Sequence, residues 1–412
     1  MKYLILGAGP AGLTAAYALL KKGIKDFCVL EDNTAPGGLC KSTIVNGSPL
    51  DIGGGHFLDS RNSKVLDIVF SLMPENEWRA YRRNSQIHIQ NSYMNNPIES
   101  NLWQLNEDTQ IEYLKSIATA GCNTGKPMPS KFTDWIRWKL GNRIADDYML
   151  PYNKKMFGKE LDKLGTYWLD KLPNVSFEES LKSCLHHKAY GHQPAHEVFI
   201  YPKEYGYGEI FDRMAVMLGD KLKLGYTVKK LDMRSHSVND DISAENIIVT
   251  IPWSSLDTIV GIPYSLSYSV KRELKHTSIA VEYHHENIDT DAHWIYEPSP
   301  DLRYHRILVR HNFCPNSRGY WTESNMGLNE FKKKFCTTQT DEKVLYKKAF
   351  YNEYAYPLNT IDKPEIMNKL LSKAKSHNVY GLGRWGEWQH YNSDVVMQRA
   401  IDLIDQLTGT NK

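Results

Sequence analysis

A glycine-rich turn between an apolar run and a helical pattern constrains this chain more than any other feature. Residues 3–6 are apolar and lead into Gly7-Ala8-Gly9-Pro10-Ala11-Gly12. The first glycine permits a tight turn, the second lets backbone approach a pyrophosphate, and the third allows close helix–strand packing. A second apolar run ends at Glu31, where a carboxylate can accept ribose hydroxyls. The pattern predicts a Rossmann-like dinucleotide site formed by Gly7, Gly9, Pro10, Ala11, Gly12 and Glu31.

A secretory signal peptide is the alternative explanation for this opening segment. Glycines interrupt its apolar stretch, and Lys21 and Lys22 follow where a small-residue cleavage site would lie. The dinucleotide interpretation is therefore favoured.

Later glycine pairs favour FAD over NAD as the dinucleotide. Residues 36–40 and 51–56 place glycines where backbone can lie against a cofactor, because side chains would hold it away. Residues 379–384 form another apolar run that ends in a Gly–Arg turn, and a closing helix follows over 395–407. We expect further cofactor contacts from Gly38, Leu39, Gly54, Gly55, His56, Val228, Gly383, Arg384, Asn392, Ser393 and Asp394.

Size and composition agree with a multi-lobed cytoplasmic enzyme. The chain has 412 residues, 41% hydrophobic content and a net charge of +2, which argues against a nucleic-acid-binding protein. Six cysteines show no CxxC spacing, which suggests reduced thiols in the cytoplasm. No apolar run approaches the length of a membrane span. The sequence leaves the oligomeric state open.

The order of apolar runs predicts an α/β protein whose Rossmann-like FAD-binding domain is interleaved with helical and mixed β-sheet substrate domains. We expect a hairpin near residues 85–94, helices from about 132, and strands at 278–283 and 306–310. The expected parts are FAD-binding segments at 1–75, 198–260 and 379–412, a hairpin and helical substrate part at 76–197, and a mixed-sheet substrate domain at 261–378.

Two segments offer other functions that we consider weaker. The stretch 135–139 has the pattern of a basic amphipathic membrane helix, but this pattern is more typical of a core-facing helix with one solvated side. His186, His187, His192 and His196 crowd a loop-like region without cysteines or acids at metal-ligand spacing. We therefore predict no metal site.

The elements together resemble the amine-oxidase-like flavoprotein superfamily, which includes protoporphyrinogen oxidases and UDP-galactopyranose mutases. Within it, the mutases match in most detail. Residues 149–157 resemble their "PYN-x-K-x-W" segment, and residues 294–298 with Arg306 resemble a strand pair that presents a tyrosine and an arginine. Residues 354–357 resemble their tyrosine–proline turn, and residues 384–394 resemble their flavin-contacting end.

The resemblance implies an FAD-dependent pyranose/furanose mutase acting on a nucleotide-diphosphate sugar, in the supply of cell-surface polysaccharide precursors. Reduced flavin N5 would be the nucleophile on the anomeric carbon, and NAD(P)H is a candidate reductant. A departing diphosphate needs cationic and phenolic donors. His56 and Arg306 would be catalytic, with His56 helping to stabilise the reduced, anionic flavin. The implied substrate contacts are Asn153, Phe157, Tyr296, Arg306, Tyr356 and His390.

Three positions depart from the mutase pattern. Leu172, with Lys171 beside it, stands where the mutases carry a second arginine, Phe157 replaces a tryptophan, and His390 replaces a tyrosine. Losing one charge-assisted contact costs about 1.5–3 kcal/mol. The sugar and the nucleotide are therefore open.

An amine-oxidase-like or protoporphyrinogen-oxidase-like oxidoreductase is the alternative function. Such an enzyme would need an apolar substrate pocket in place of a phosphate-binding Arg306. It would also form hydrogen peroxide in turnover, whereas a mutase consumes no reductant per turnover.

Overall fold

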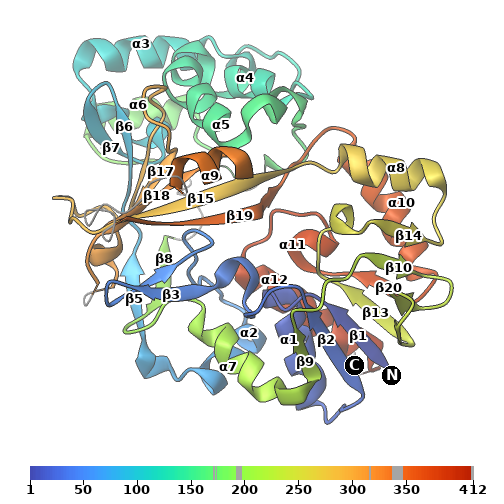
Figure 1. Ribbon diagram of the computed structural model, residues 1–412. Helices are drawn as coiled ribbons and strands as arrows, with labels where there is room; N and C mark the ends of the chain where they lie inside the picture. The colour runs from blue at the N-terminus through green and yellow to red at the C-terminus, as the bar shows by residue number, and fades with distance from the viewer. Residues whose placement is uncertain (170–171, 173, 192–196, 315–316, 336–346, 410–412) are drawn as a thin grey trace.

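A parallel five-stranded sheet forms the base of the protein. The computed structural model describes all residues except 170–171, 173, 192–196, 315–316, 336–346 and 410–412 (Figure 1). The strand order is β20-β13-β1-β2-β9. The strands are β1 (Tyr3–Leu6), β2 (Phe27–Glu31), β9 (Leu222–Leu224), β13 (Asn246–Val249) and β20 (Val379–Gly381). Segments far apart in the sequence thus meet in one sheet, as the interleaved pattern predicts.

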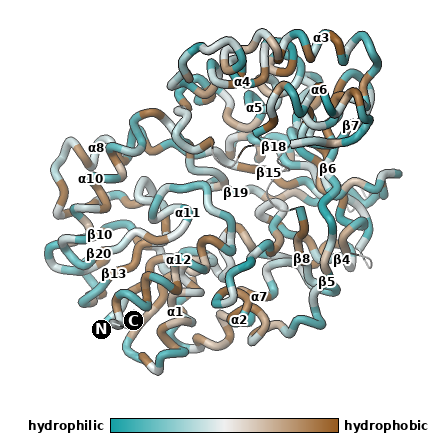
Figure 2. Tube along the Cα trace, turned by 180° about the vertical axis from the view of Figure 1, so that it is seen from behind, coloured by the Kyte–Doolittle hydropathy of each residue, from teal (hydrophilic) through white to brown (hydrophobic). Residues whose placement is uncertain are grey.

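Both faces of this sheet are buried, which explains why its strands are almost wholly apolar. Ile5 and Val29 pack on one face with the helices α1 (Pro10–Lys21), α2 (Ser63–Leu72), α7 (Glu209–Leu218) and α12 (Ser393–Leu407). Figure 2 shows hydrophobic stretches along α1, α2 and α7. The alternate residues Leu4, Leu6 and Leu30 pack on the other face.

That other face is covered by a small sheet and two helices. The small sheet has the order β12-β11-β10-β14. Its strands are β10 (Lys230–Asp232), β11 (Ser237–Val238), β12 (Ile242–Ser243) and β14 (Thr258–Val260), and the helices are α8 (Tyr264–Glu273) and α10 (Lys363–Lys375). Val228, Leu231 and Met367 contribute to the shared apolar cluster.

A mixed seven-stranded sheet lies between the base and a helical lobe (Figure 1). Its order is β19-β15-β18-β17-β16-β6-β7, and only β16 and β6 run parallel. The strands are β6 (Ser85–Ile89), β7 (Ser92–Asn95), β15 (His276–His284), β16 (Trp294–Tyr296), β17 (Arg306–Leu308), β18 (Tyr320–Ser324) and β19 (Lys347–Pro357). The helix α9 (Leu328–Phe335) packs on β19. We call this sheet the substrate sheet.

Two antiparallel ribbons connect the base with the substrate sheet. One pairs β3 (Ser42–Val45) with β4 (Ser48–Asp51), and the other pairs β5 (Trp78–Arg82) with β8 (Val198–Pro202). The short helix α11 (Gly383–Gly386) follows β20.

The helical lobe covers the end of the substrate sheet that is remote from the base. It contains α3 (Glu107–Ala118), α4 (Phe132–Ile144), a π-helical turn (Ala145–Met149), α5 (Leu150–Phe157) and α6 (Phe177–His186). Trp135 is 7% exposed and packs in the lobe core, so α4 is the core-facing helix that its sequence favours. Among the described residues, no helix is long and apolar enough to cross a membrane.

Two local expectations are wrong. The strand predicted over 306–310 ends at Leu308, because Arg310 begins a 3₁₀ turn and its guanidinium contacts Tyr201. The tyrosine–proline turn predicted at 354–357 is the end of β19, because Tyr356 and Pro357 pair with Thr277 and His276 of β15 beyond an irregularity in the register. The hairpin near residues 85–94 is confirmed as β6 and β7.

Candidate functional site

The glycine turn between β1 and α1 is shaped for close backbone approach. Gly7 has φ of +102°, and a Cβ added at Gly12 would lie 1.9 Å from the Gly7 carbonyl oxygen. Gly9 is the N-cap of α1 and offers no side-chain cap to the first-turn N–H groups. Those N–H groups and the helix dipole suit an anionic phosphate.

Glu31 holds this turn directly. Its Oε2 accepts a hydrogen bond from the Ala8 amide at 2.7 Å, and its Oε1 accepts from the Asn33 amide and side chain at 3.0 and 2.6 Å. The Tyr226 amide donates to the Glu31 carbonyl oxygen at 2.8 Å, which brings the segment carrying Val228 to the same strand end. A carboxylate has about four lone-pair sites, so capacity for ribose hydroxyls remains.

The glycine segment at residues 37–40 contacts the turn between β1 and α1. A Cβ at Gly38 would lie 3.0 Å from the Gly9 Cα, and a Cβ at Gly53 would lie 2.0 Å from the Leu39 carbonyl oxygen. The backbones of residues 37–40 and 53–55 therefore pack where side chains have no room.

The turn after β20 completes this side of the site. Gly383 has φ of +76°, and a Cβ there would lie 2.7 Å from the Ala11 Cβ. Arg384 donates to the Ala355 carbonyl at 3.1 Å and to the Tyr391 carbonyl at 2.8 and 3.1 Å. Burial lowers the pKa of Arg384. No carboxylate in the described part of the chain pairs with it, so its charge favours an anionic occupant.

The first turn of α12 follows the same turn. Asn392 is its N-cap, and Ser393 and Asp394 begin the helix. The Ser393 hydroxyl is 2.7 Å from the Tyr207 hydroxyl, and the Tyr207 ring stacks on His56 with centroids 6.3 Å apart. The residues predicted to contact the cofactor thus come from β1, β2, two glycine segments and the start of α12.

A buried polar cluster positions the glycine–histidine loop. Asp51 is fully buried and accepts from the Ser42 hydroxyl and the Tyr201 hydroxyl, both at 2.6 Å. Arg310 donates to the same Tyr201 hydroxyl and supplies the balancing charge. Burial raises the pKa of Asp51, and Arg310 opposes that rise. Because Gly53–Gly54–Gly55–His56 begins two residues after Asp51, this cluster fixes the start of the loop.

His56 is held in its neutral form. Its Nδ1 lies 2.9 Å from the Gly54 carbonyl oxygen and acts as the donor, which leaves Nε2 as an acceptor. Burial, together with the nearby Arg384 and Arg306, lowers the pKa of His56 to about 3. A neutral imidazole adds no positive charge, so Arg384 is the cation on this side of the site.

Glu323 joins the glycine–histidine loop to Arg306, and the sequence analysis missed it. Its Oε1 accepts from the Gly55 amide at 2.9 Å, and its Oε2 accepts from Arg306 Nε at 2.6 Å. Glu323 is fully buried and lies opposite Arg306 in the β17–β18 register. A single acid in the otherwise uncharged strand Tyr320–Ser324 is the signal that marks it.

Arg306 lies among tyrosine hydroxyls as well. Its Nη2 donates to the Tyr356 hydroxyl at 3.2 Å, and Tyr296 lies directly opposite Arg306 in the β16–β17 register. The Tyr356 ring contacts His390, with centroids 4.9 Å apart, and the Arg384 guanidinium lies 5.8 Å from the Tyr356 centroid. The predicted residues Tyr296, Arg306, Tyr356 and His390 are therefore brought together.

The two residues predicted on α5 to contact substrate make contacts within the helical lobe. Asn153 is buried and donates to the Met149 carbonyl one helical turn earlier, at 2.7 Å. Phe157 packs in the apolar core of the helical lobe. Tyr152 is the α5 residue that reaches the substrate sheet, where its ring meets the Tyr296 ring edge-on at 5.4 Å. No pattern in the sequence distinguishes Tyr152 from its neighbours on α5.

The remaining residues that the sequence analysis discussed lie in or near the helical lobe or outside the described part of the chain. Leu172 is partly buried against the apolar cluster of the helical lobe, and Lys171 lies outside the described residues. His187 is exposed, and His192 and His196 lie outside the described residues. Within the described part of the chain, no group of three histidine, cysteine or acidic side chains is placed to hold a metal.

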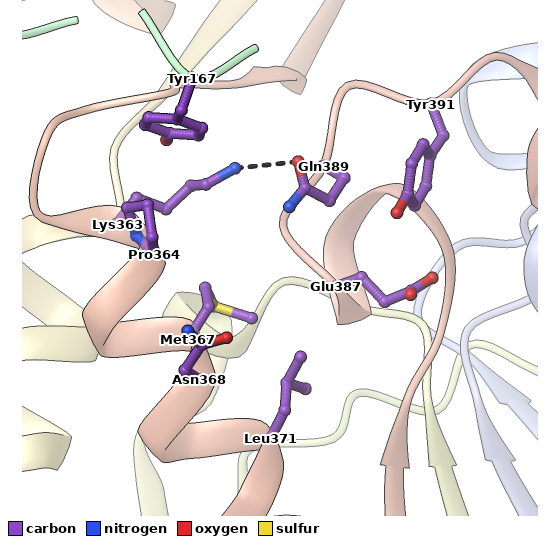
Figure 3. A pocket seen from close by; sticks show the side chains of 9 residues that line it. All are labelled: Tyr167, Lys363, Pro364, Met367, Asn368, Leu371, Glu387, Gln389 and Tyr391. Carbon is purple, nitrogen blue, oxygen red and sulfur yellow. Dashed lines mark hydrogen bonds between the residues drawn. The ribbon is translucent and has the colours of Figure 1, made fainter. Parts of the chain in front are cut away.

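A cavity of about 170 Å³ is lined in part by Gln389 and Tyr391, the two residues on either side of His390 in the chain (Figure 3). Its wall includes Lys363, which is 1% exposed. The Lys363 ammonium donates to Asn359 Oδ1 at 2.8 Å, the Trp388 carbonyl at 2.9 Å and Gln389 Oε1 at 3.0 Å. Lys363 thus holds the segment that precedes His390.

Comparison with known proteins supports this architecture. Residues 5–71 match the family model of the NAD(P)-binding Rossmann-like domain. A stretch of 115 residues is 30% identical to putrescine oxidase from Kocuria rosea, covering 28% of this chain and 23% of the oxidase. This match therefore spans less than a quarter of that relative's length.

Two solved structures cover almost the whole chain. The crystal structure of reduced UDP-galactopyranose mutase has a TM-score of 0.87 at 21% identity, over 99% of this chain and 94% of that chain. A protein from Exiguobacterium sp. 255-15 described as a protoporphyrinogen oxidase has a TM-score of 0.71 at 12% identity, over 100% and 99%. The chain therefore has the α/β fold seen in UDP-galactopyranose mutase and in the protoporphyrinogen-oxidase-like structure, built on a Rossmann-like dinucleotide-binding domain.

Proposed function

We propose that this protein is an FAD-dependent mutase that interconverts the pyranose and furanose forms of a nucleotide-diphosphate sugar. The observation that carries the proposal is the row of donors on the substrate sheet. Arg306 contacts Tyr356, lies opposite Tyr296, and is joined through Glu323 to the Gly55 amide. Guanidinium and phenol donors beside a cofactor loop suit a ligand that carries a diphosphate.

The residues of the base fit FAD. The close approaches at Gly12, Gly38 and Gly383 leave backbone rather than side chains along the site. The uncapped start of α1 suits the pyrophosphate, and Glu31 lies where the adenosine ribose of a Rossmann cofactor is held. The buried Arg384 suits a flavin that becomes anionic when reduced. FAD, when bound and reduced, supplies N5 as a nucleophile toward the anomeric carbon.

The chain's own residues would stabilise the leaving diphosphate. As the glycosidic C–O bond breaks, negative charge develops on the departing phosphate oxygen, and prearranged donors lower the energy of that state. The Tyr356 hydroxyl accepts from Arg306, so its own proton remains available to a ligand. The neutral His56 fixes the Gly54 carbonyl through its Nδ1–H and holds the loop at the flavin.

An amine oxidase is the second candidate, supported by the 30% identity to putrescine oxidase over 115 residues. An oxidase of this kind needs an unpaired carboxylate or an apolar pocket for its amine substrate. Here the buried Glu323 is already paired with Arg306 and the Gly55 amide. That pairing leaves Glu323 unavailable as the carboxylate that an amine substrate would need.

The proposal is tested with purified holoenzyme and a panel of UDP-, GDP- and dTDP-sugars. We expect dithionite-reduced enzyme to convert one of them to an isomer of equal mass, with no stoichiometric consumption of reductant. Oxidised enzyme should be inactive. Release of one hydrogen peroxide per turnover from an amine, with no sugar isomerised, would establish the oxidase instead.

A further inference from the structure

Arg83 is a second arginine on the same face of the substrate sheet. It lies between β5 and β6, and its Nη2 donates to the Tyr296 hydroxyl at 2.8 Å. Its Nε donates to the Ser85 hydroxyl at 3.2 Å, and its guanidinium lies 4.5 Å from the centroid of the Trp294 ring. A guanidinium that stacks on an indole keeps its charge while losing little conformational freedom.

Arg83 fixes the direction in which the Tyr296 proton points. The Tyr296 hydroxyl oxygen accepts from Arg83 and also from Trp294 Nε1 at 3.0 Å. A phenolic oxygen has two acceptor sites and one proton. Both acceptor sites are occupied, so this hydroxyl can make a further hydrogen bond only by donating, and an anion is the partner it suits.

The charges of Arg83 and Arg306 affect the pKa values of two tyrosines in the helical lobe, Tyr148 and Tyr152. Burial raises the pKa values of Tyr148 and Tyr152 well above their ordinary range, while Arg83 opposes the rise at Tyr148 and Arg306 opposes it at Tyr152. The Tyr148 and Tyr152 ring centroids are 5.8 Å apart. The charges of Arg83 and Arg306 therefore both act on this pair of tyrosines, whose member Tyr152 meets the Tyr296 ring edge-on.

Arg83 is also linked to the cofactor loop. The Trp294 ring beneath it stacks on Phe57, with centroids 5.4 Å and planes 14° apart, and Phe57 follows His56. The contact from Phe57 through Trp294 to Arg83 parallels the contact from Gly55 through Glu323 to Arg306. Both arginines are thus held against the same loop.

We propose that Arg83, acting with the Tyr296 hydroxyl, is the second phosphate-binding cation of the site and that Arg306 is the first. This inference rests on the proposed function, because it assumes that the ligand carries a diphosphate. It makes an arginine at position 172 unnecessary, since Leu172 packs against the lobe core.

The test is a calorimetric titration of oxidised holoenzyme with UDP, GDP and dTDP, and with the matching monophosphate and nucleoside of the tightest binder. In Arg83→Gln, we expect the diphosphate to bind about 10- to 100-fold more weakly, which corresponds to about 1.4–2.7 kcal/mol. Nucleoside binding should be unchanged. Arg83→Lys keeps the positive charge but loses the two parallel N–H donors of the guanidinium, so its diphosphate affinity should lie between those of the wild type and Arg83→Gln.

Arg82→Gln is the matched control. Arg82 is the preceding residue, its side chain is 83% exposed, and it pairs at 3.1 Å with Glu197 on the surface. It should bind the diphosphate as the wild type does, and flavin content should be equal in all variants. An equal loss of nucleoside and diphosphate affinity in Arg83→Gln would indicate a structural role and overturn the inference.

Different results would contradict the proposed function and the role of Arg83. If wild-type enzyme binds none of the three nucleoside diphosphates, the proposed function fails together with the inference. If wild-type enzyme binds one of them and Arg83→Gln binds it equally well, only the role of Arg83 is wrong.

Discussion

The nucleotide-binding base and the substrate sheet form their halves of the site in different ways. In the base, the proposed cofactor contacts come from backbone, and glycines at positions 7, 9 and 12 leave room for it. In the substrate sheet, the proposed substrate contacts come from charged and phenolic side chains, with Glu323 joining Arg306 to the opposing loop. The base depends on the absence of side chains, whereas the sheet depends on the pairing of side chains distant in sequence. Substitutions in the base should therefore lower flavin binding, whereas substitutions in the substrate sheet should lower stability and turnover.

The largest effect is expected from Glu323→Gln, which removes the buried charge that balances Arg306. Breaking a buried ion pair by removing one partner costs about 3–5 kcal/mol. We expect a clear fall in melting temperature and loss of turnover. Glu330→Gln is the control, because Glu330 is 51% exposed and pairs with Arg303 at the surface. Surface pairs contribute about 0–1 kcal/mol, so this variant should melt like the wild type. Equal melting of both variants would show that Glu323 does not hold the two halves together.

The next effect is expected from Gly12→Ala, which tests the base. The added Cβ would lie 1.9 Å from the Gly7 carbonyl oxygen, so the turn has to shift. Overpacking of this kind costs about 1–3 kcal/mol. Flavin content per chain, measured by absorbance after purification, should fall strongly.

Gly327→Ala provides the comparison for that variant. A Cβ at Gly327 meets nothing within 4 Å and its φ is not positive, so flavin content should be unchanged. Full flavin content in Gly12→Ala would mean that backbone approach at this turn does not govern cofactor binding.

The sequence predicts the nucleotide-binding base better than the substrate sheet, because the base depends on residues that are close together in the chain. The turn around Gly9 and the hairpin at β6 and β7 are specified by residues close together in the chain, and the structure contains both as predicted. Glu31 ends β2 as the pattern predicts, where it accepts from the Ala8 amide, and its contact with a ribose stays a prediction. Arg83 could not be distinguished from Arg82, since only the sheet register turns one inward and leaves the other exposed.

Glu323 and Tyr356 illustrate the same limit. Glu323 acquires its role from two segments that lie far from it in sequence, the loop at Gly55 and the strand at Arg306. Tyr356 was expected in a turn, but a long pairing with β15 extends its strand. Long-range pairing is not encoded in a local pattern, so these residues emerge only in the folded chain.

The effect that is smallest per step of the measurement is expected from pH. Burial lowers the pKa of His293 to about 4, below its value in the unfolded chain. The unfolded state then binds more protons between about pH 6.5 and 4, so stability is fully present above pH 6.5 and is lost as the pH falls. One such histidine changes stability by at most about 1.4 kcal/mol per pH unit. The melting temperature of His293→Asn should fall less steeply from pH 7 to 4 than that of the wild type.

His187→Asn is the control variant for this pH series, because His187 is exposed. His187→Asn should keep the wild-type slope, because this change leaves the buried His293 in place. A wild-type slope in His293→Asn as well would assign the acid sensitivity to other groups.

The most direct test of the account is the turnover and flavin content of Arg306→Lys. Lysine keeps a positive charge against the fully buried Glu323 but loses the fork that also reaches the Tyr356 hydroxyl. With the nucleotide sugar identified from the panel, we predict wild-type flavin content and a turnover lowered by at least about 100-fold, as expected for a contact of about 2.7 kcal/mol that acts on the leaving diphosphate. Near wild-type turnover with full flavin content would contradict the assignment of Arg306, and with it the claim that this face of the substrate sheet binds the diphosphate.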